Sequence, residues 1–270
     1  MKTRIIAAAV LLPIFLLIVL ATPGIYTAIL LGIMAAIAAY ELLQSTQIVK
    51  NIRLTAYAMV MAFAAAIWSY FECNVVAAEI GIFVFVSILM AEVMYSRMKL
   101  PMGQVAACLV AGLLIPYLFT SLVRIRQMDN GRLFIIAPCV VAFLSDTGAY
   151  FVGCALGKHK LAPSISPKKT IEGVIGGILG AVLGMLLYCV VLMLAFDMKV
   201  NYINALLYGV IGSLVAVFGD LCFSVIKRQS GIKDYGNLIP GHGGILDRFD
   251  SMVFVGPLVE FLLILLPLAV

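Results

Sequence analysis

Long apolar runs recur along this chain and are separated by short polar segments. Hydrophobic residues make up 64% of its 270 residues, and the mean hydropathy is +1.16. A soluble fold would expose far too much of this apolar surface, whereas a helix of about 20 apolar residues can cross the hydrocarbon core of a bilayer. The sequence therefore predicts an all-α polytopic membrane protein, with residues 1–270 as a single integral membrane domain.

About nine of the apolar runs are predicted to be transmembrane helices. The sixth run has only 12 residues before Ser145-Asp146-Thr147-Gly148 interrupts it. Because a span needs about 20 residues, we expect this helix to continue through the polar residues to Leu156. A kink is expected at Pro116 in the fifth run. The predicted spans are residues 5–20, 25–43, 54–70, a fourth run that ends near 94, 105–122, 133–156, 171–196, 203–218 and 252–270.

The distribution of lysine and arginine predicts the orientation in the membrane. With a cytoplasmic N-terminus and nine crossings, 14 of the 18 basic residues fall on the cytoplasmic side. Cytoplasmic loops carry the excess of basic residues in membrane proteins, so this asymmetry favours a multi-pass protein of the cell inner (cytoplasmic) membrane. Because the basic residues border membrane spans, no nucleic acid partner is expected.

Charged residues are concentrated in the 27 residues from Ser224 to Asp250. A charged side chain in hydrocarbon costs at least ~3 kcal/mol, so this density of charge beside apolar sequence indicates a functional site. A cytoplasmic loop that follows the positive-inside rule would explain the basic residues but not the acidic ones. The segment contains four basic residues, three aspartates and one histidine, namely Lys227, Arg228, Lys233, Arg248, Asp234, Asp247, Asp250 and His242.

Acidic side chains recur at helical spacing around this segment. Asp220, Ser224 and Lys227 share one face if the preceding helix continues. Asp247 and Asp250 would likewise share a face of the next helix. Two carboxylates within ~4 Å repel by about 4 kcal/mol at an effective dielectric of 20, so such pairs indicate a bound cation or a shared proton.

A glycine-rich turn, Pro240-Gly241-His242-Gly243-Gly244, lies between the two groups of carboxylates. Turns of this kind let backbone N–H groups approach an anion closely. Carboxylates for a divalent metal ion, basic side chains and open backbone are together the components of a nucleotide phosphate site.

The segment as a whole, S-x-I-K-R-x4-K-D-x-G-x2-I-P-x-H-G-G-I-x-D-R-F-D, resembles the signature of the phosphatidate cytidylyltransferases, or CDP-diacylglycerol synthases, and departs from it at no position. A second stretch, S-P-K-K-T-x-E-G at residues 166–173, also resembles a segment of this family. The resemblance implies transfer of the cytidylyl group of CTP to phosphatidate in the membrane, which gives CDP-diacylglycerol and pyrophosphate. The implied cofactor is Mg²⁺, alone or with a second cation.

On this resemblance Asp220 and Asp247 are expected to be the principal metal ligands, with Asp146 and Asp250 as secondary ones. Asp146 interrupts an apolar run, where an acidic side chain must find a cation, a partner or water. The expected catalytic residues are Asp220, Asp247, Lys227 and Arg228, and the expected substrate- or phosphate-binding residues are Ser224, Lys168, Lys169, Lys233, Asp234, His242, Gly243, Gly244 and Arg248.

Several interpretations stay open at this point. Lys168 and Lys169 are expected to enter a helix N-terminus, where they either contact phosphate or only mark the cytoplasmic side. His242 is either a proton donor or a structural, phosphate-bonding residue. Glycines recur at helical spacing from Gly173 to Gly184, which favours close helix packing within one chain or in a homodimer.

We expect residues 1–132 to form a lipid-facing scaffold and residues 133–270 to carry the catalytic motifs. A cleft open to both water and bilayer is expected, because CTP arrives from the cytoplasm and phosphatidate from the membrane. The alternative functions are a CTP-dependent polyprenol or lipid kinase and an ion-coupled transporter. A transporter predicts two similar halves, whereas the polar motifs here lie only from Ser145 onward.

Overall fold

The computed structural model describes residues 13–71, 75–97, 99–238 and 243–269. Its packing separates two compact units. The N-terminal unit comprises residues 1–129 and 229–249, and the C-terminal unit comprises residues 130–228 and 250–270. Residues 229–249 therefore pack with a part of the chain that is distant in sequence. The predicted division into a scaffold half and a catalytic half stays a prediction.

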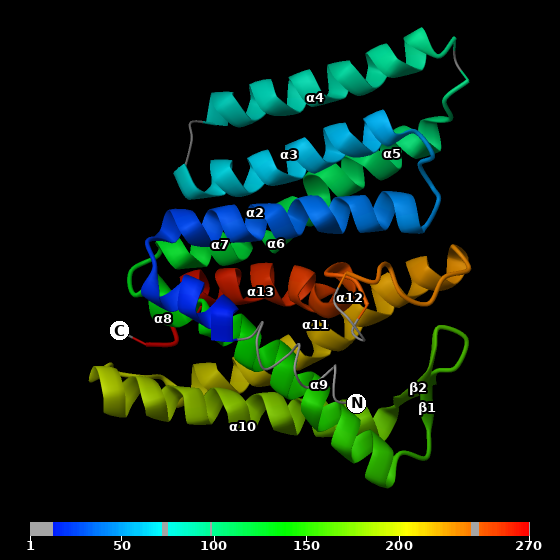
Figure 1. The fold of residues 1–270 in the computed structure, drawn as a ribbon. Coiled ribbons are helices and arrows are strands. Elements are labelled where there is room, and N and C mark those ends of the chain that lie inside the picture. Colours follow the sequence, from blue (N-terminus) through cyan, green and yellow to red (C-terminus); the bar gives the residue numbers. More distant parts are fainter. Residues whose placement is uncertain (1–12, 72–74, 98, 239–242, 270) are drawn as a thin grey trace. The chain divides into compact units, whose positions relative to one another are not determined.

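The N-terminal unit is a layer of helices (Figure 1). α2 packs against α3, which in turn contacts α4. Gly32 permits the close approach of α2, because a Cβ there would lie 2.8 Å from the Phe63 ring. After a helical stretch at residues 13–21, the elements of the unit are α2 (Gly24–Tyr40), η1 (Glu41–Ser45), α3 (Ile52–Phe71), α4 (Val75–Tyr95), α5 (Met102–Leu109), η2 (Val110–Leu114), α6 (Ile115–Phe119), α7 (Ser121–Gln127) and α12 (Leu246–Phe249).

Two of these elements, η1 and η2, are π-helical turns. η2 immediately precedes α6, whose second residue is Pro116. Proline lacks an N–H group and its ring crowds the preceding turn, so the irregular geometry lies on the N-terminal side of Pro116. η1 extends α2 and begins at Glu41, an acidic residue at the end of an otherwise apolar span.

The C-terminal unit is built on α9, α10 and α11. α9 runs without interruption through residues 145–148, so the prediction that this helix continues to Leu156 is confirmed. α11 likewise continues past Asp220 to Gln229, beyond the predicted end at residue 218. The elements of the unit are α8 (Gly131–Phe134), α9 (Ile136–Leu156), β1 (Lys160–Ala162), β2 (Ser166–Thr170), α10 (Ile171–Phe196), α11 (Tyr202–Gln229) and α13 (Met252–Leu265).

The polar stretch between α9 and α10 is a two-stranded antiparallel hairpin of β1 and β2. Composition alone had indicated only a polar connection here, within a wholly α-helical fold. The expectation that Lys168 and Lys169 enter a helix N-terminus is wrong, because both belong to β2. Thr170 is the N-cap of α10 instead, and its Oγ1 accepts a hydrogen bond from the Gly173 N–H at 3.1 Å.

The glycines of α10 allow close packing against α9, which confirms the expectation of close helix contact within the chain. A Cβ at Gly176 would lie 2.7 Å from the Gly148 carbonyl oxygen and would overlap Val152. A Cβ at Gly180 would lie 2.5 Å from the Leu144 carbonyl oxygen. Small residues let helix backbones approach in this way in membrane proteins. The packing of α10 against α9 within one chain therefore explains these glycines, and the homodimer stays a prediction.

The protein is a polytopic membrane protein that is α-helical apart from the hairpin. Within the described ranges, seven helical segments are long and apolar enough to cross a bilayer, and α13 is a shorter apolar helix. α13 ends at Leu265, before the predicted end at residue 270. The predicted first span, residues 5–20, falls largely outside the described residues, so the count of nine spans stays a prediction.

Candidate active site

In the C-terminal unit, Asp220 lies on α11 and is held by two donors. Lys169 Nζ lies 2.6 Å from Asp220 Oδ2, and Ser224 Oγ donates a hydrogen bond to Asp220 Oδ1 at 3.2 Å. Asp220 and Ser224 therefore share one helix face, as their spacing predicts. The Asp220 and Lys169 side chains keep 28% and 22% of their accessible surface, so this ion pair is open enough for an incoming ligand to exchange partners.

The hairpin separates the two lysines that precede α10. Successive side chains of a strand point to opposite faces, and accordingly Lys168 is exposed while Lys169 is half-buried. Lys169 also donates to the Val217 carbonyl oxygen at 3.5 Å, which fixes its ammonium beside α11. A neighbouring basic residue, Arg228, donates from Nε to the Ile165 carbonyl oxygen at 3.1 Å. The hairpin therefore brings one of its lysines to the carboxylate of Asp220.

We expect Lys169→Gln to lower kcat/KM more than Lys168→Gln does, because of these two lysines only Lys169 pairs with Asp220. The expected difference in kcat/KM between the two variants is about tenfold, or about 1.4 kcal/mol of transition-state stabilisation. Both variants remove one positive charge from the same hairpin, so they are matched for net charge. Steady-state kinetics on the purified proteins measure this difference. Equal losses would contradict the assignment of Lys169 to the site.

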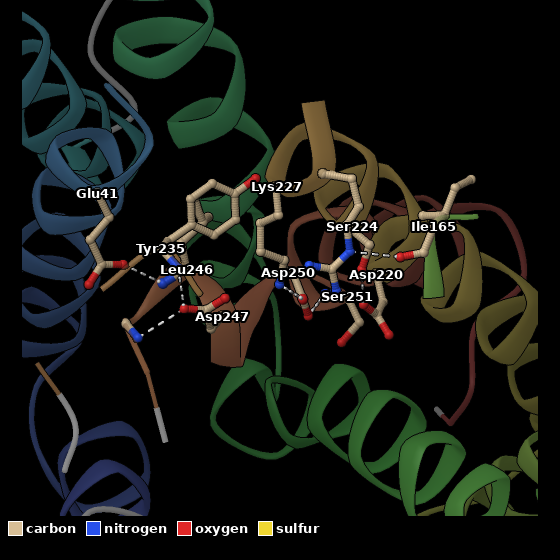
Figure 2. A network of polar contacts seen from close by, with 12 residues as sticks. Glu41, Ile165, Asp220, Ser224, Lys227, Tyr235, Leu246, Asp247, Asp250 and Ser251 are labelled. Carbon is tan, nitrogen blue, oxygen red and sulfur yellow. Dashed lines mark hydrogen bonds and ion pairs between the residues drawn. The ribbon is translucent and has the colours of Figure 1, made fainter. Parts of the chain in front are cut away.

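Asp250 lies next to this group in the same unit. Lys227 Nζ is 3.9 Å from Asp250 Oδ2, and the Ser251 N–H donates to Asp250 Oδ1 at 2.8 Å (Figure 2). Burial raises the pKa of Asp250 from 3.8 to about 7, and the negative charge of Asp220 adds to this rise while Lys227 opposes it. Asp220 and Asp250 are thus close enough to repel each other.

Asp146, near the middle of α9, also belongs to this group. Its charge contributes to the raised pKa of Asp250. The preceding residue, Ser145, is fully buried and its hydroxyl lies 2.7 Å from the hydroxyl of Ser213 on α11. This contact fixes the turn of α9 that carries Asp146. The C-terminal unit therefore gathers six of the predicted residues, namely Asp146, Lys169, Asp220, Ser224, Lys227 and Asp250.

In the N-terminal unit, Asp247 on α12 organises the glycine-rich part of the motif. Its Oδ2 atom accepts hydrogen bonds from the N–H groups of Tyr235 at 2.7 Å and Gly244 at 3.0 Å (Figure 2). Gly243 has a φ of +89°, which disfavours any residue with a side chain. A Cβ at Gly243 would in addition lie 2.9 Å from Asp247 Oδ2. Asp247 thus has a bracing role that its sequence context did not predict.

A second carboxylate, Glu41, braces the same segment and was not predicted as a site residue. Its Oε1 accepts from the Ile245 N–H at 3.0 Å, and its Oε2 accepts from the Leu246 N–H at 2.8 Å. These N–H groups belong to the start of α12, where negative charge is favoured. The signal that could have found Glu41 is its place as a lone acidic residue at the end of an apolar span.

The remaining predicted residues of the motif differ in exposure. Lys233, Asp234 and Arg248 are exposed, and the backbone of Gly244 is buried against Glu41. His242 lies outside the described residues, so both interpretations of its role stay predictions. That Asp220 and Asp247 bind one metal ion also stays a prediction.

The acidic residues suit a hard cation in their chemistry. Carboxylate oxygens are the ligands that Mg²⁺ takes from proteins, usually one or two at a time, with water and substrate phosphates completing the shell. The mutual repulsion of Asp220 and Asp250 is what a bound cation would relieve. Across the described residues, no group of three or more acidic, histidine or cysteine side chains is arranged to hold an ion by itself. The carboxylates of the C-terminal unit therefore suit Mg²⁺ by their chemical type.

Comparison with known proteins agrees with the motifs. The profile described as "Cytidylyltransferase family" matches residues 2–266. The chain is 36% identical to the phosphatidate cytidylyltransferase of Bacillus subtilis (strain 168), over 98% of each chain. It is 35% identical to the protein of that name from Staphylococcus haemolyticus, over 98% of this chain and 99% of the relative. The resemblance seen in the sequence is confirmed, and the chain belongs to the cytidylyltransferase family.

Proposed function

We propose that this protein transfers the cytidylyl group of CTP to phosphatidate, giving CDP-diacylglycerol and pyrophosphate for phospholipid biosynthesis. The observation that carries the proposal is the 36% identity to a phosphatidate cytidylyltransferase over 98% of each chain. The groups described above suit this reaction. In the C-terminal unit, Lys169 pairs with Asp220 and Lys227 lies 3.9 Å from Asp250, so this unit brings cations and carboxylates together.

The chemistry requires charge neutralisation more than proton transfer. A phosphomonoester has a second pKa near 6, so phosphatidate is mostly dianionic at pH 7 and needs no side-chain base. Its oxygen attacks the α-phosphorus of CTP, and the bond from that phosphorus to the β,γ-pyrophosphate breaks. Two polyanions must be held together for this attack, so the residues of the site contribute chiefly by positioning and by electrostatic stabilisation.

The basic side chains would contact the phosphates. Lys227 and Arg228 on α11 are the proposed catalytic cations, and Lys169 can move from Asp220 to a phosphate when CTP binds. Lys233 and Arg248, which are exposed, are proposed to contact phosphate from the motif segment (the described residues 233–238 and 243–248), together with the backbone N–H group of Gly243. The N–H group of Gly244, a predicted phosphate contact, donates to Asp247 instead. Ser224 orients the Asp220 carboxylate through its hydrogen bond.

The acidic side chains would hold Mg²⁺. Asp220 and Asp250, with Asp146 beside them, are proposed ligands in the C-terminal unit, and Asp247 is a proposed ligand in the N-terminal unit. When bound, the ion would neutralise phosphate charge and polarise the transferring group. The pairing of Asp220 with Lys169 orients that carboxylate before the substrate arrives.

The proposed location is the cytoplasmic membrane, with the site facing the cytoplasm. The asymmetry of the basic residues, 14 of 18 on one side in a nine-span arrangement, supports this orientation. CTP is supplied on that side. Phosphatidate would enter laterally from the bilayer, as a lipid substrate does.

Product analysis tests the function directly. Purified protein in detergent, supplied with Mg²⁺, CTP labelled on the α-phosphate and phosphatidate, should form labelled CDP-diacylglycerol and one pyrophosphate per turnover. Chelation of the metal with EDTA should stop the reaction, and added Mg²⁺ should restore it. Release of CDP with a phosphorylated alcohol would support a CTP-dependent lipid kinase instead. Absence of labelled lipid under all these conditions would overturn the proposal.

A further inference from the structure

In the N-terminal unit, two buried carboxylates from different parts of the chain accept hydrogen bonds from the backbone of the motif segment. Asp247 accepts hydrogen bonds from the N–H groups of Tyr235 and Gly244, and Glu41 accepts from those of Ile245 and Leu246. Glu41 keeps only 3% of its accessible surface and Asp247 keeps 9%. Together they accept hydrogen bonds from four backbone N–H groups, one before the glycine-rich turn, one at its last residue and two after it. We call Glu41 and Asp247 the carboxylate clamp.

Two glycines of the motif are shaped to the Glu41 carboxylate. A Cβ at Gly236 would lie 2.8 Å from Glu41 Oε1, and a Cβ at Gly244 would overlap the same carboxylate. Gly236 has no positive φ, so backbone freedom does not account for its lack of a side chain. The space that a side chain would need is occupied by Glu41. The motif segment is therefore fitted to one residue that lies 204 positions earlier than Ile245.

The local structure of α2 supports a dedicated role for Glu41. An ionised side chain is rarely buried unless it has charged or hydrogen-bonding partners. The helix leaves α geometry at this residue, because η1 begins at Glu41 and is a π-helical turn. Such turns inside α-helices are frequently found at functional sites, since they redirect side chains. Here the turn accompanies a carboxylate that is directed to the start of α12 (Figure 2).

We propose that Glu41 is a positioning residue for cytidylyl transfer, which sets the backbone conformation of residues 244–247 and, through Asp247, the position of Tyr235. This inference rests on the proposed function, because the reaction gives the segment its role. Glu41 does not touch substrate in this assignment. It acts through the backbone of residues 244–246 and through Asp247, and so determines where Lys233 and Arg248 present their charges.

An isosteric substitution of Glu41 distinguishes a positioning role in catalysis from a role in folding. Glu41→Gln keeps the size of the side chain but turns one acceptor into an N–H donor that faces a backbone N–H. We expect kcat to fall about 10²-fold, since small displacements of catalytic groups have effects of that size, while the KM for phosphatidate stays within about twofold. Glu41→Asp, which keeps the charge, should recover part of the loss. The matched control is Glu79→Gln, an exposed residue of α4.

Hydrogen exchange supplies a readout that does not depend on activity. The amides of Ile245 and Leu246 should exchange faster in Glu41→Gln, whereas peptides of α9 and α10 and the melting temperature should match the wild type. Unchanged kcat with fast exchange of these amides would overturn the positioning role. Loss of kcat together with global destabilisation in both Glu41 variants would also overturn it, in favour of a purely structural role.

The fit between Gly236 and Glu41 gives a second, independent test. Gly236→Ala should lower kcat because its Cβ displaces the Glu41 carboxylate, and shortening that carboxylate in the double variant Gly236→Ala with Glu41→Asp should raise kcat again. Additive losses would contradict the proposal. If the wild-type protein forms no CDP-diacylglycerol while exchange at residues 245 and 246 still responds to Glu41→Gln, the proposed function fails and the clamp itself stands.

Discussion

Asp220→Asn should lower turnover by at least about 10³-fold, or about 4 kcal/mol, while the protein still folds and inserts. The amide lacks the negative charge that a carboxylate would offer to a metal ion. It also removes the ion pair that positions the Lys169 ammonium. Stability should change little. The Asp220–Lys169 pair is about a quarter exposed, and pairs of this kind contribute ~1 kcal/mol or less to folding. The large effect on turnover and the small effect on folding distinguish a catalytic carboxylate from a structural one.

The matched control for this experiment is Asp197→Asn. Asp197 ends α10 in a left-handed conformation with φ of +54°, which asparagine also adopts readily. Turnover by the control should stay within about twofold of wild type, by the ordinary rule for surface substitutions. The melting temperature and the elution volume in detergent check folding for both variants. An Asp220→Asn protein that retains a tenth of wild-type turnover would contradict the proposed role of Asp220 as a metal ligand.

Asp247→Asn and Asp247→Ala together separate the two roles of Asp247. The asparagine can still offer one oxygen to the N–H groups of Tyr235 and Gly244, whereas alanine leaves both without this acceptor. A metal-ligand role predicts that turnover falls about 10³-fold in both variants, because both lose the charge. Each buried donor left unsatisfied costs about 1–3 kcal/mol. The alanine variant should therefore also be less stable and exchange its loop amides faster.

A different result would assign Asp247 to bracing alone. If purified Asp247→Asn keeps most of its turnover while Asp247→Ala loses both turnover and loop protection, the carboxylate acts only as a hydrogen-bond acceptor. Asp129→Asn is the matched control, since Asp129 is an exposed residue of the same unit. The comparison is made by measuring the turnover of Asp247→Asn, Asp247→Ala and Asp129→Asn at saturating Mg²⁺.

The helical spans could be predicted from the sequence because their signal is local. The length of the apolar runs was enough to predict α10 and α11. The minimum length of a membrane helix also predicted correctly that α9 continues past Asp146. The hairpin of β1 and β2 was missed because it is short and polar and has no alternating hydrophobic pattern. The π-helical turn at Glu41 was missed too, since no residue pattern there marks a change of helix type.

The candidate site could be predicted residue by residue but not as a set of contacts. Spacing on one helix placed Asp220 beside Ser224, which the structure confirms. The pairing of Lys169 with Asp220 depends on the hairpin, and helix periodicity contains no information about it. Glu41 was missed for the same reason, because its partners are 204 and 205 residues away in the chain. Only tertiary packing brings such residues together.

Residues 229–249 are synthesised late but belong to the unit that contains residues 1–129, and this affects how that unit can fold during translation. The ribosome completes α2 to α7 of the N-terminal unit early, yet the segment that Glu41 holds is made only after most of the chain has been synthesised. Until then the Glu41 carboxylate has no Ile245 or Leu246 to bind. Domains fold largely as contiguous units during translation, and this unit is an exception to that order. The N-terminal unit therefore cannot be completed until residues 229–249 have been synthesised.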